Sequence, residues 1–325
     1  MVEKMNNNLS IKNIDFYYDL FDEAIMLLYD KLGIDYLRGF LRVYNDISLN
    51  QINTHLLEDE DIIKLEEIET KIIEASILNE EVRKALLLII IKAFKHCKMN
   101  LDIITPDFIC YIFANLIKMI SEDRSNDVFS VLDVNVGTAN LLNLISNNLD
   151  QDYLLTGVEK EEDLVRIAEA YSDLQGNDIR LCFNNCLDNI DLRADVIIGD
   201  LDCSYQEDKY LPYEIIIKYQ NAFLKEGRND NFMIFMVDND FFNQKGIDQF
   251  KEKFKGTICG LIVLPSELFQ SKGKSILVIN QKYFDKFDTM LINWPKPSEE
   301  DKIYDIIIKL HDWIKNIKKY KEKKK

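Results

Sequence analysis

The sequence is poor in the residues that cross-link a chain or bind metals. Its 325 residues include 6 cysteines and 3 histidines, and the cysteines form no CxxC pair. A zinc site built on cysteine pairs is therefore not expected, and we interpret the thiols as reduced side chains. His55 and His96 fall in different predicted helices, so neither indicates a metal site.

Long apolar runs are also missing. The longest, Ala85 to Ile91, is far shorter than the roughly 18 residues of a membrane span. The first residues, MVEKMNNNLS, lack the basic and then apolar pattern of a signal peptide. We therefore expect a cytoplasmic protein without a membrane segment.

Positive charge is scarce as well. The 56 acidic side chains exceed the 40 lysines and arginines, which gives a formal net charge of -16. Because neutralisation of phosphates supplies much of the affinity for nucleic acids, any nucleic-acid partner is expected to bind weakly. The exception is the lysine-rich segment Lys315 to Lys325, and such a run is more often a solvated helix end than a nucleic-acid or membrane contact.

The two halves of the chain differ in periodicity. Up to about residue 104, apolar residues recur every three or four positions, which predicts helices at 16–31, 36–47, 58–69 and about 80–96. From Phe129 onward, strands are predicted at 129–133, 153–158, 179–183, 194–199, 231–237, 257–264 and 274–280. Interleaved helices are predicted at about 138–148, 160–175, 212–225 and 243–254, with a closing amphipathic helix at 301–325.

This alternation indicates an α/β fold. We expect a seven-stranded, Rossmann-like, largely parallel sheet that is covered by helices on both faces. The last two strands are separated by a segment too short for a helical crossover, so we expect them to pair antiparallel at the sheet edge.

The most informative segment is Phe129 to Asn140, FSVLDVNVGTAN. A predicted strand ends in Asp133, a turn with Gly137 follows, and a helix then begins. Such a turn at the carboxyl end of a strand can hold a nucleotide-like ligand. The next predicted strand ends in Glu159, whose carboxylate can accept hydrogen bonds from ribose hydroxyls. The alternative is an ordinary α/β turn with an acidic residue nearby.

Four motifs resemble those of the class I S-adenosylmethionine-dependent methyltransferases, within the N6-adenine DNA methylase-like branch of Gram-positive bacteria. The resemblance spans about Thr105 to Lys282. Thr105-Pro106-Asp107 is similar to the TP motif that contacts the methionine end of the cofactor. Asp133 to Asn140, DVNVGTAN, stands where the family has D-P-x-x-G-T-G-N, and Glu159 stands at the ribose-binding acid. Asp200-Leu201-Asp202-Cys203 stands where active amino-methylases have [NDS]-P-P-[YFW].

The resemblance implies that S-adenosylmethionine is the cofactor. It also implies which residues contact the cofactor, with Glu159 as the ribose-binding acid. These residues are Thr105, Asp133, Val134, Gly137, Thr138, Asn140, Glu159, Asn185 and Cys186. Asn185 stands where the family places an aspartate near the cofactor adenine, and asparagine can still accept a hydrogen bond there. Ala139 replaces the second glycine of the turn, which is tolerable if its backbone angle is ordinary.

The resemblance also implies that Asp200, Leu201, Asp202 and Cys203 form the loop at which the methyl group is transferred. In the family a side-chain oxygen and a backbone carbonyl accept the two protons of the target amine, and an aromatic ring stacks on a flipped base. Asp200 keeps the first acceptor. Leu201 and Asp202 replace both prolines, and Cys203 replaces the aromatic residue. Tyr205 could stack only if this loop is rebuilt.

Two functions follow from the resemblance. The first is a methyltransferase acting on an amino group, with the N6 of adenine in DNA as substrate. The second is a SAM-binding or scaffold protein whose transfer loop has decayed. A dehydrogenase is disfavoured because G-x-G-x-x-G is absent. We expect an N-terminal helical domain at 1–104, a methyltransferase-like domain at 105–297, and a C-terminal helix with its lysine-rich tail at 298–325. The oligomeric state stays open.

Overall fold

The computed structural model describes residues 9–122, 128–149, 153–188, 194–201, 203–225, 231–269 and 272–322. It divides into two compact units. The first consists of residues 1–106, 137–148 and 161–179, and the second of residues 107–136, 149–160 and 180–325. Each unit is described by itself.

The first unit is helical. Its helices are α2 (Ile11–Leu32), α3 (Tyr36–Leu49), α4 (Asp59–Glu74), α5 (Asn79–Cys97), α7 (Asn140–Asn148) and α8 (Glu162–Asp173). Local signals set several of their ends. The Ser10 side chain accepts the Asn13 N–H at the start of α2, and Gly33 ends that helix in the left-handed conformation. Asp35 caps α3 in the same way as Ser10 caps α2.

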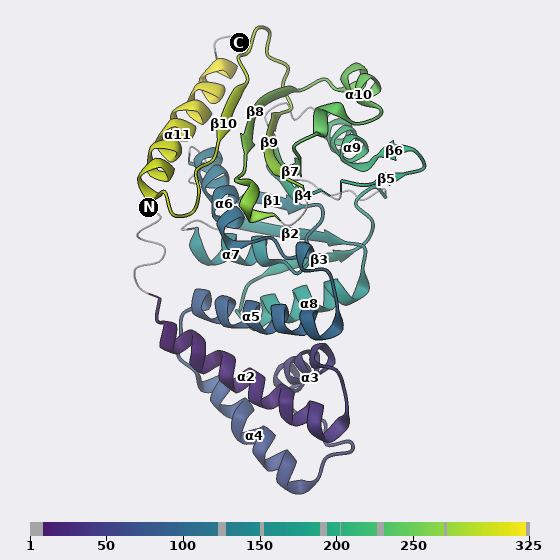
Figure 1. Cartoon of the computed structure of the whole chain (residues 1–325), viewed down its shortest axis with the longest axis vertical. Coiled ribbons are helices and arrows are strands. Elements are labelled where there is room, and N and C mark those ends of the chain that lie inside the picture. The colour runs from purple at the N-terminus through teal and green to yellow at the C-terminus, as the bar shows by residue number, and fades with distance from the viewer. Residues whose placement is uncertain are drawn as a thin grey trace. The chain divides into compact units, whose positions relative to one another are not determined.

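The core of this unit forms where α2 packs against α3, α4 and α5 (Figure 1). Phe21, Phe40 and Leu86 are among its fully buried side chains. Apolar residues of α8, including Ile167 and Tyr171, belong to the same core. The three- and four-residue spacing of apolar side chains in the sequence therefore corresponds to one continuous buried cluster.

The second unit is built on an eight-stranded sheet with the order β10-β8-β9-β7-β4-β1-β2-β3. The strands are β1 (Phe129–Asp133), β2 (Tyr153–Glu159), β3 (Ile179–Phe183), β4 (Val196–Asp200), β7 (Phe232–Asp238), β8 (Thr257–Val263), β9 (Lys274–Asn280) and β10 (Met290–Asn293). Strands β1, β2, β4 and β7 run parallel to their neighbours in this series. Strand β9 is antiparallel to both β7 and β8, and β10 pairs parallel with β8.

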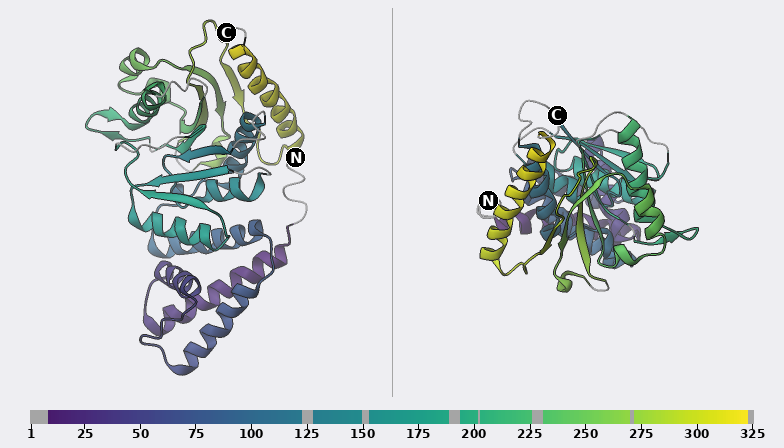
Figure 2. Two further views of the ribbon diagram at one scale, coloured as in Figure 1. Left: turned by 180° about the vertical axis from the view of Figure 1, so that it is seen from behind. Right: turned by 90° about the horizontal axis from the view of Figure 1, so that it is seen from above.

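Helices of the second unit lie on both faces of this sheet. Figure 2 shows α9 (Leu211–Lys225) and α10 (Ile247–Lys253) on one face, and α6 (Asp107–Ser121) and α11 (Glu300–Glu322) on the other. On the first face, Tyr213, Tyr219 and Phe250 pack with apolar residues of the central strands such as Ile197 and Phe235. A two-stranded hairpin, β5 (Tyr205–Gln206) and β6 (Lys209–Tyr210), precedes α9.

The predicted α/β fold with a largely parallel sheet is confirmed. The seven predicted strands are present, and their bounds differ from the predicted ones by at most two residues. The antiparallel pairing of β8 with β9 is also confirmed, although β9 lies inside the sheet rather than at its edge. The eighth strand, β10, and the β5–β6 hairpin were not predicted, because runs of four and two residues carry too little periodicity to be recognised.

One helical stretch, Leu101–Ser121, is long and apolar enough to cross a membrane by length and composition alone. The sequence analysis did not recognise this stretch, because polar residues divide it into shorter apolar runs. Of its 18-residue window, 61% is buried within the structure. A buried core helix passes the same test, so the stretch is weak evidence for a membrane span.

Candidate functional site

Four neighbouring strands of the second unit each end in a carboxylate. Strands β1, β2, β4 and β7 end in Asp133, Glu159, Asp200 and Asp238. Because these strands are parallel, their carboxyl ends meet at one edge of the sheet. Asp133, Glu159 and Asp238 are buried. This edge is therefore strongly acidic, which favours a ligand that carries positive charge.

Asp133 is held largely out of water. Its pKa is raised to about 7, chiefly by burial and to a smaller extent by the charges of Glu159 and Asp200, whereas a hydrogen bond from the Asn135 N–H lowers it. The Asn135 nitrogen lies 3.0 Å from Asp133 Oδ1. Asp133 therefore changes its charge near neutral pH instead of near its ordinary pKa of 3.8.

Glu159 stands in the chain between Val158 and Lys160, which both line a small cavity in the second unit. Its Oε1 accepts the Lys160 N–H at 2.8 Å, and its carbonyl accepts the Asn184 N–H at 2.8 Å. The cavity has a volume of about 50 Å³, and its lining includes Val134, Val158 and Asn185. A groove of about 450 Å³ shares Asn185, Leu187, Gln206 and Leu211 with this lining.

Asn185 and Cys186 lie in the loop after β3. The Asn185 side-chain oxygen accepts the Leu187 N–H at 2.9 Å, which fixes the loop in a tight turn. The Cys186 carbonyl accepts hydrogen bonds from the Lys218 ammonium and, at 3.3 Å, from the Tyr219 hydroxyl. Burial raises the pKa of the Cys186 thiol. Both predicted residues line the small cavity.

The Gly137 turn belongs to the first unit. Gly137 has a φ of +54°, and a Cβ at this position would lie 2.9 Å from the Ile103 carbonyl oxygen. Both the backbone angle and the close approach therefore require glycine. Thr138 is buried, and its hydroxyl has no hydrogen-bond partner among the described residues. An unpaired buried hydroxyl is a group that a bound ligand can satisfy.

The condition under which alanine would be tolerated without strain at position 139, an ordinary backbone angle, is not met. The φ of Ala139 is +62°, in the left-handed region that costs a residue with a Cβ about 1–2 kcal/mol. The turn therefore keeps the shape that two glycines would allow, at the expense of strain at Ala139.

Asn140 and Thr105 are joined directly. Asn140 Nδ2 donates to the Thr105 carbonyl at 2.8 Å, and Asn140 Oδ1 accepts from Arg83 Nη1 at 2.6 Å. Since both ends of this amide have protein partners, the side chain of Asn140 holds the turn in place. A cofactor contact by Asn140 would have to use its backbone.

The side chain of Asp200 is engaged by an ion pair. The Lys274 ammonium, at the start of β9, lies 2.8 and 3.0 Å from the two carboxylate oxygens. Burial disfavours the charge on Lys274, but Asp200 outweighs this effect and raises the pKa of Lys274. Asn135 Nδ2 donates to the Asp200 backbone carbonyl at 2.8 Å. The acceptor that the family directs at a target amine therefore already has a charged donor.

The next residues of the predicted transfer loop are also engaged. The Leu201 carbonyl accepts from the Cys203 thiol at 3.3 Å, and Cys203 Sγ accepts the Asp238 N–H at 3.3 Å. Burial raises the pKa of Cys203 to about 11, so its thiol stays protonated at neutral pH. Asp202 lies outside the described residues. The Tyr205 hydroxyl donates to Gln244 at 2.8 Å and accepts the Lys245 N–H at 3.0 Å, so it is directed at the segment that precedes α10.

Several residues of these sites were not predicted. Lys274 and Asp238 contact or adjoin the transfer loop, and Asn135 reaches Asp200 from the Asp133 motif. Asp238 could have been found from its place at the end of a strand, like Asp133. The pairing of Lys274 depends on the antiparallel return of β9 and leaves no local pattern in the sequence. Within the described ranges, no three His, Cys, Asp or Glu side chains gather in a way that would hold a metal ion.

Comparisons with known proteins agree with this architecture. No protein-family model matches the chain. It is similar to the uncharacterized protein YtxK of Bacillus subtilis, with 24% identity over 93% of this chain and 97% of that protein. A Listeria monocytogenes crystal structure, provisionally assigned as a class I S-adenosylmethionine-dependent methyltransferase, superposes with a TM-score of 0.80. It is 24% identical and covers 94% of this chain and 100% of its own.

A more distant likeness is to the methyltransferase subunit of a type I restriction-modification system from Streptococcus thermophilus. Its TM-score is 0.50 at 13% identity, and the match covers 91% of this chain and 93% of that chain. The protein therefore has the mixed α/β, Rossmann-like fold of the class I S-adenosylmethionine-dependent methyltransferases.

The pKa of Asp133 predicts a specific pH dependence of stability. Because the folded state binds this proton more tightly than the unfolded state, the contribution is full below about pH 4 and is lost as the pH rises through about 7. Asp133→Asn should remove a decline of up to about 1.4 kcal/mol per pH unit in this window. Urea unfolding from pH 4 to 8 measures it, with the exposed Asp163→Asn as control. Parallel curves for wild type and Asp133→Asn would contradict the assignment.

The Gly137 turn predicts a difference between two glycine substitutions in the first unit. Gly137 and Gly176 both have positive φ, but a Cβ at Gly176 would meet nothing within 4 Å. Gly176→Ala should cost only the backbone term of about 1–2 kcal/mol. Gly137→Ala should cost distinctly more, because the Ile103 carbonyl must also move. Equal losses in chemical denaturation would show that the close approach is unimportant.

Proposed function

We propose that this protein binds S-adenosylmethionine and that its transfer loop is closed to target amines. The observation that carries the second part is the ion pair between Lys274 and Asp200. A carboxylate that already accepts two hydrogen bonds from an ammonium group is poorly placed to accept the protons of a substrate amine. The loop is thus better suited to a binding or scaffold role than to transfer.

The residues present fit the cofactor. The sulfonium and ammonium groups of S-adenosylmethionine are cationic, and the part of the sheet edge that carries Asp133 and Glu159 is acidic. The buried Thr138 hydroxyl lacks a partner among the described residues. Glu159 offers a carboxylate for the ribose hydroxyls, and Asn185 lines the cavity that Val158 and Lys160 also line. We propose that Asp133, Gly137, Thr138, Asn140 and Glu159 form the binding residues.

When bound, the cofactor supplies an electrophilic methyl group. The tasks of the protein would be to hold its ribose and methionine ends and to keep water away from the methyl group. Amine methylation additionally needs two free acceptors on the transfer loop. The Leu201 carbonyl and the Asp200 carboxylate stand in those positions, and both have protein donors.

A second candidate function is methyl transfer to an amino group, with N6 of adenine in nucleic acid as the substrate class. Two observations favour it. Asp200 ends β4, the position of the first acceptor in active amino-methylases. The fold also resembles the methyltransferase subunit of a restriction-modification system. The acidic net charge of -16 argues for weak association with DNA.

Titration calorimetry with S-adenosylmethionine tests the first proposal. At about 100 times its dissociation constant, the ligand should stabilise the fold by roughly 2.7 kcal/mol. Glu159→Gln should weaken binding by about 1.5–3 kcal/mol, the range for a hydrogen bond to a charged group. Asp163→Asn, an exposed carboxylate on α8, should bind as the wild type does. The absence of both a heat of binding and a thermal shift at millimolar ligand would refute the proposal.

Transfer of a radiolabelled methyl group to adenine-containing DNA separates the two candidates. We expect none from the wild type. Lys274→Met, combined with Leu201→Pro, Asp202→Pro and Cys203→Tyr, should gain transfer, because it frees Asp200 and restores the family loop. Asp200→Ala in this background should abolish the gain without changing cofactor affinity. Robust transfer by the wild type that Asp200→Ala removes would instead establish the methyltransferase.

A further inference from the structure

We infer that Arg83, on the N-terminal helix α5, is a positioning residue for cofactor binding that acts through Asn140. This inference rests on the proposed binding of S-adenosylmethionine. Arg83 and the turn from Gly137 to Asn140 lie in the same unit of the structure. The N-terminal helices would thereby take part in shaping the cofactor site.

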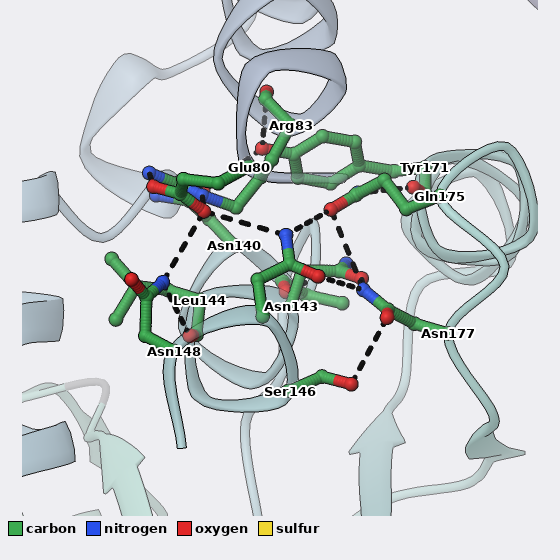
Figure 3. A network of polar contacts seen from close by, with 12 residues as sticks. Glu80, Arg83, Asn140, Asn143, Leu144, Ser146, Asn148, Tyr171, Gln175 and Asn177 are labelled. Carbon is green, nitrogen blue, oxygen red and sulfur yellow. Dashed lines mark hydrogen bonds and ion pairs between the residues drawn. The ribbon is translucent and has the colours of Figure 1, made fainter. Parts of the chain in front are cut away.

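The Arg83 guanidinium is fully buried. Its Nε and Nη2 lie 2.7 and 2.8 Å from the two carboxylate oxygens of Glu80, one turn earlier on α5. Its Nη1 donates to Asn140 Oδ1 at 2.6 Å (Figure 3). One side of the planar guanidinium thus binds the Glu80 carboxylate, and the other side binds Asn140, the first residue of α7.

Asn140 is held from three directions. Besides Arg83, its Oδ1 lies 3.0 Å from the Tyr171 hydroxyl on α8, which also lies 2.9 Å from the Arg83 carbonyl. Its Nδ2 donates to the Thr105 carbonyl at 2.8 Å. A side chain bonded to α5, α8 and the 101–106 segment cannot change rotamer without breaking several buried hydrogen bonds.

The same polar contacts continue along α7. Asn143, Asn147 and Asn148 follow Asn140 on one face of this helix, three, seven and eight residues further along the chain. Asn143 Nδ2 donates to the Ala139 carbonyl and to the Ser172 hydroxyl, both at 3.0 Å. Asn147 Nδ2 donates to the Gln175 side-chain oxygen at 2.9 Å. The helix that follows the turn is therefore fixed by directional bonds as well as by apolar packing.

The strain in the turn explains why it needs this support. Ala139 is in the left-handed conformation, and Gly137 approaches the Ile103 carbonyl closely. Strained backbone persists only where its surroundings over-determine it. The Arg83–Asn140 bond is the charged hydrogen bond next to the strained residue, so losing it should let the turn relax toward a shape that no longer fits the ligand.

Arg83→Lys separates positioning from folding. An ammonium at this site can still neutralise Glu80, but it cannot hold Glu80 and Asn140 with the rigid fork of a guanidinium. We expect calorimetry to show roughly a tenfold loss of S-adenosylmethionine affinity, the lower end of the range for a hydrogen bond to a charged group. Amide hydrogen exchange of residues 137–143 in the free protein should become faster than in the wild type.

Arg42→Met is the matched control. It removes the Arg42–Asp46 ion pair, within the same unit but on α3, and should leave the affinity unchanged. Asn140→Ala should weaken binding, and the double variant with Arg83→Lys should be no weaker than Asn140→Ala alone, because the two effects share one path. Tyr171→Phe removes the hydroxyl that bonds to Asn140 but leaves the ion pair between Arg83 and Glu80 intact, so it should weaken binding mildly.

The outcomes distinguish the two proposals. If the wild type binds the cofactor and Arg83→Lys binds equally well, with unchanged exchange at 137–143, the inference about Arg83 is overturned and the proposed function stands. Additive losses in the double variant would also overturn it, because Arg83 would then act by another route. A wild type without any binding overturns the proposed function and this inference together.

Discussion

The burial of the Arg83 charge is the constraint on which the first unit depends. Moving a charge out of water costs several kcal/mol unless it is paired and its donors are satisfied. Glu80 supplies the countercharge by accepting from Nε and Nη2, and Asn140 accepts a hydrogen bond from Nη1. A requirement that arises in an N-terminal helix is thus met by the first residue after the glycine turn. Electrostatics in α5 and the shape of that turn therefore cannot vary independently.

The second unit faces the opposite problem, an excess of negative charge. Four parallel strands end in carboxylates at one edge, and mutual repulsion contributes to the raised pKa of Asp133. Two lysines near the start of β9 offset part of this charge, since Lys274 pairs with Asp200 and Lys272 with Asp238. The antiparallel strand β9 thus brings lysines to the carboxylates that end the central strands β4 and β7, and it leaves Asp133 and Glu159, at the ends of β1 and β2, as the acidic part.

The sequence predicts those features whose cause is local. Apolar runs that end in a polar residue located β1, β2 and β4, and with them Asp133, Glu159 and Asp200. The backbone angle of Ala139 could not be predicted, because alanine prefers another region and tertiary contacts override that preference. Nor could the partners of Asp200 and Asn140, since Lys274 and Arg83 are distant in sequence and reach them only after folding. Arg83 does, however, lie on the same face of α5 as the buried Leu86 and Ile90. A charged residue at a position where the helical pattern predicts a core side chain could have been recognised in the sequence as one that needs a buried partner.

The short strand β10 affects how the protein behaves toward other copies of itself. It terminates the sheet and spans only Met290–Asn293, and Pro295 and Pro297 follow it closely. Proline has no N–H to offer, so a strand from another molecule could add to this edge over only a few residues. Together with a net charge of -16, this ending limits edge-to-edge pairing between molecules on the β10 side of the sheet.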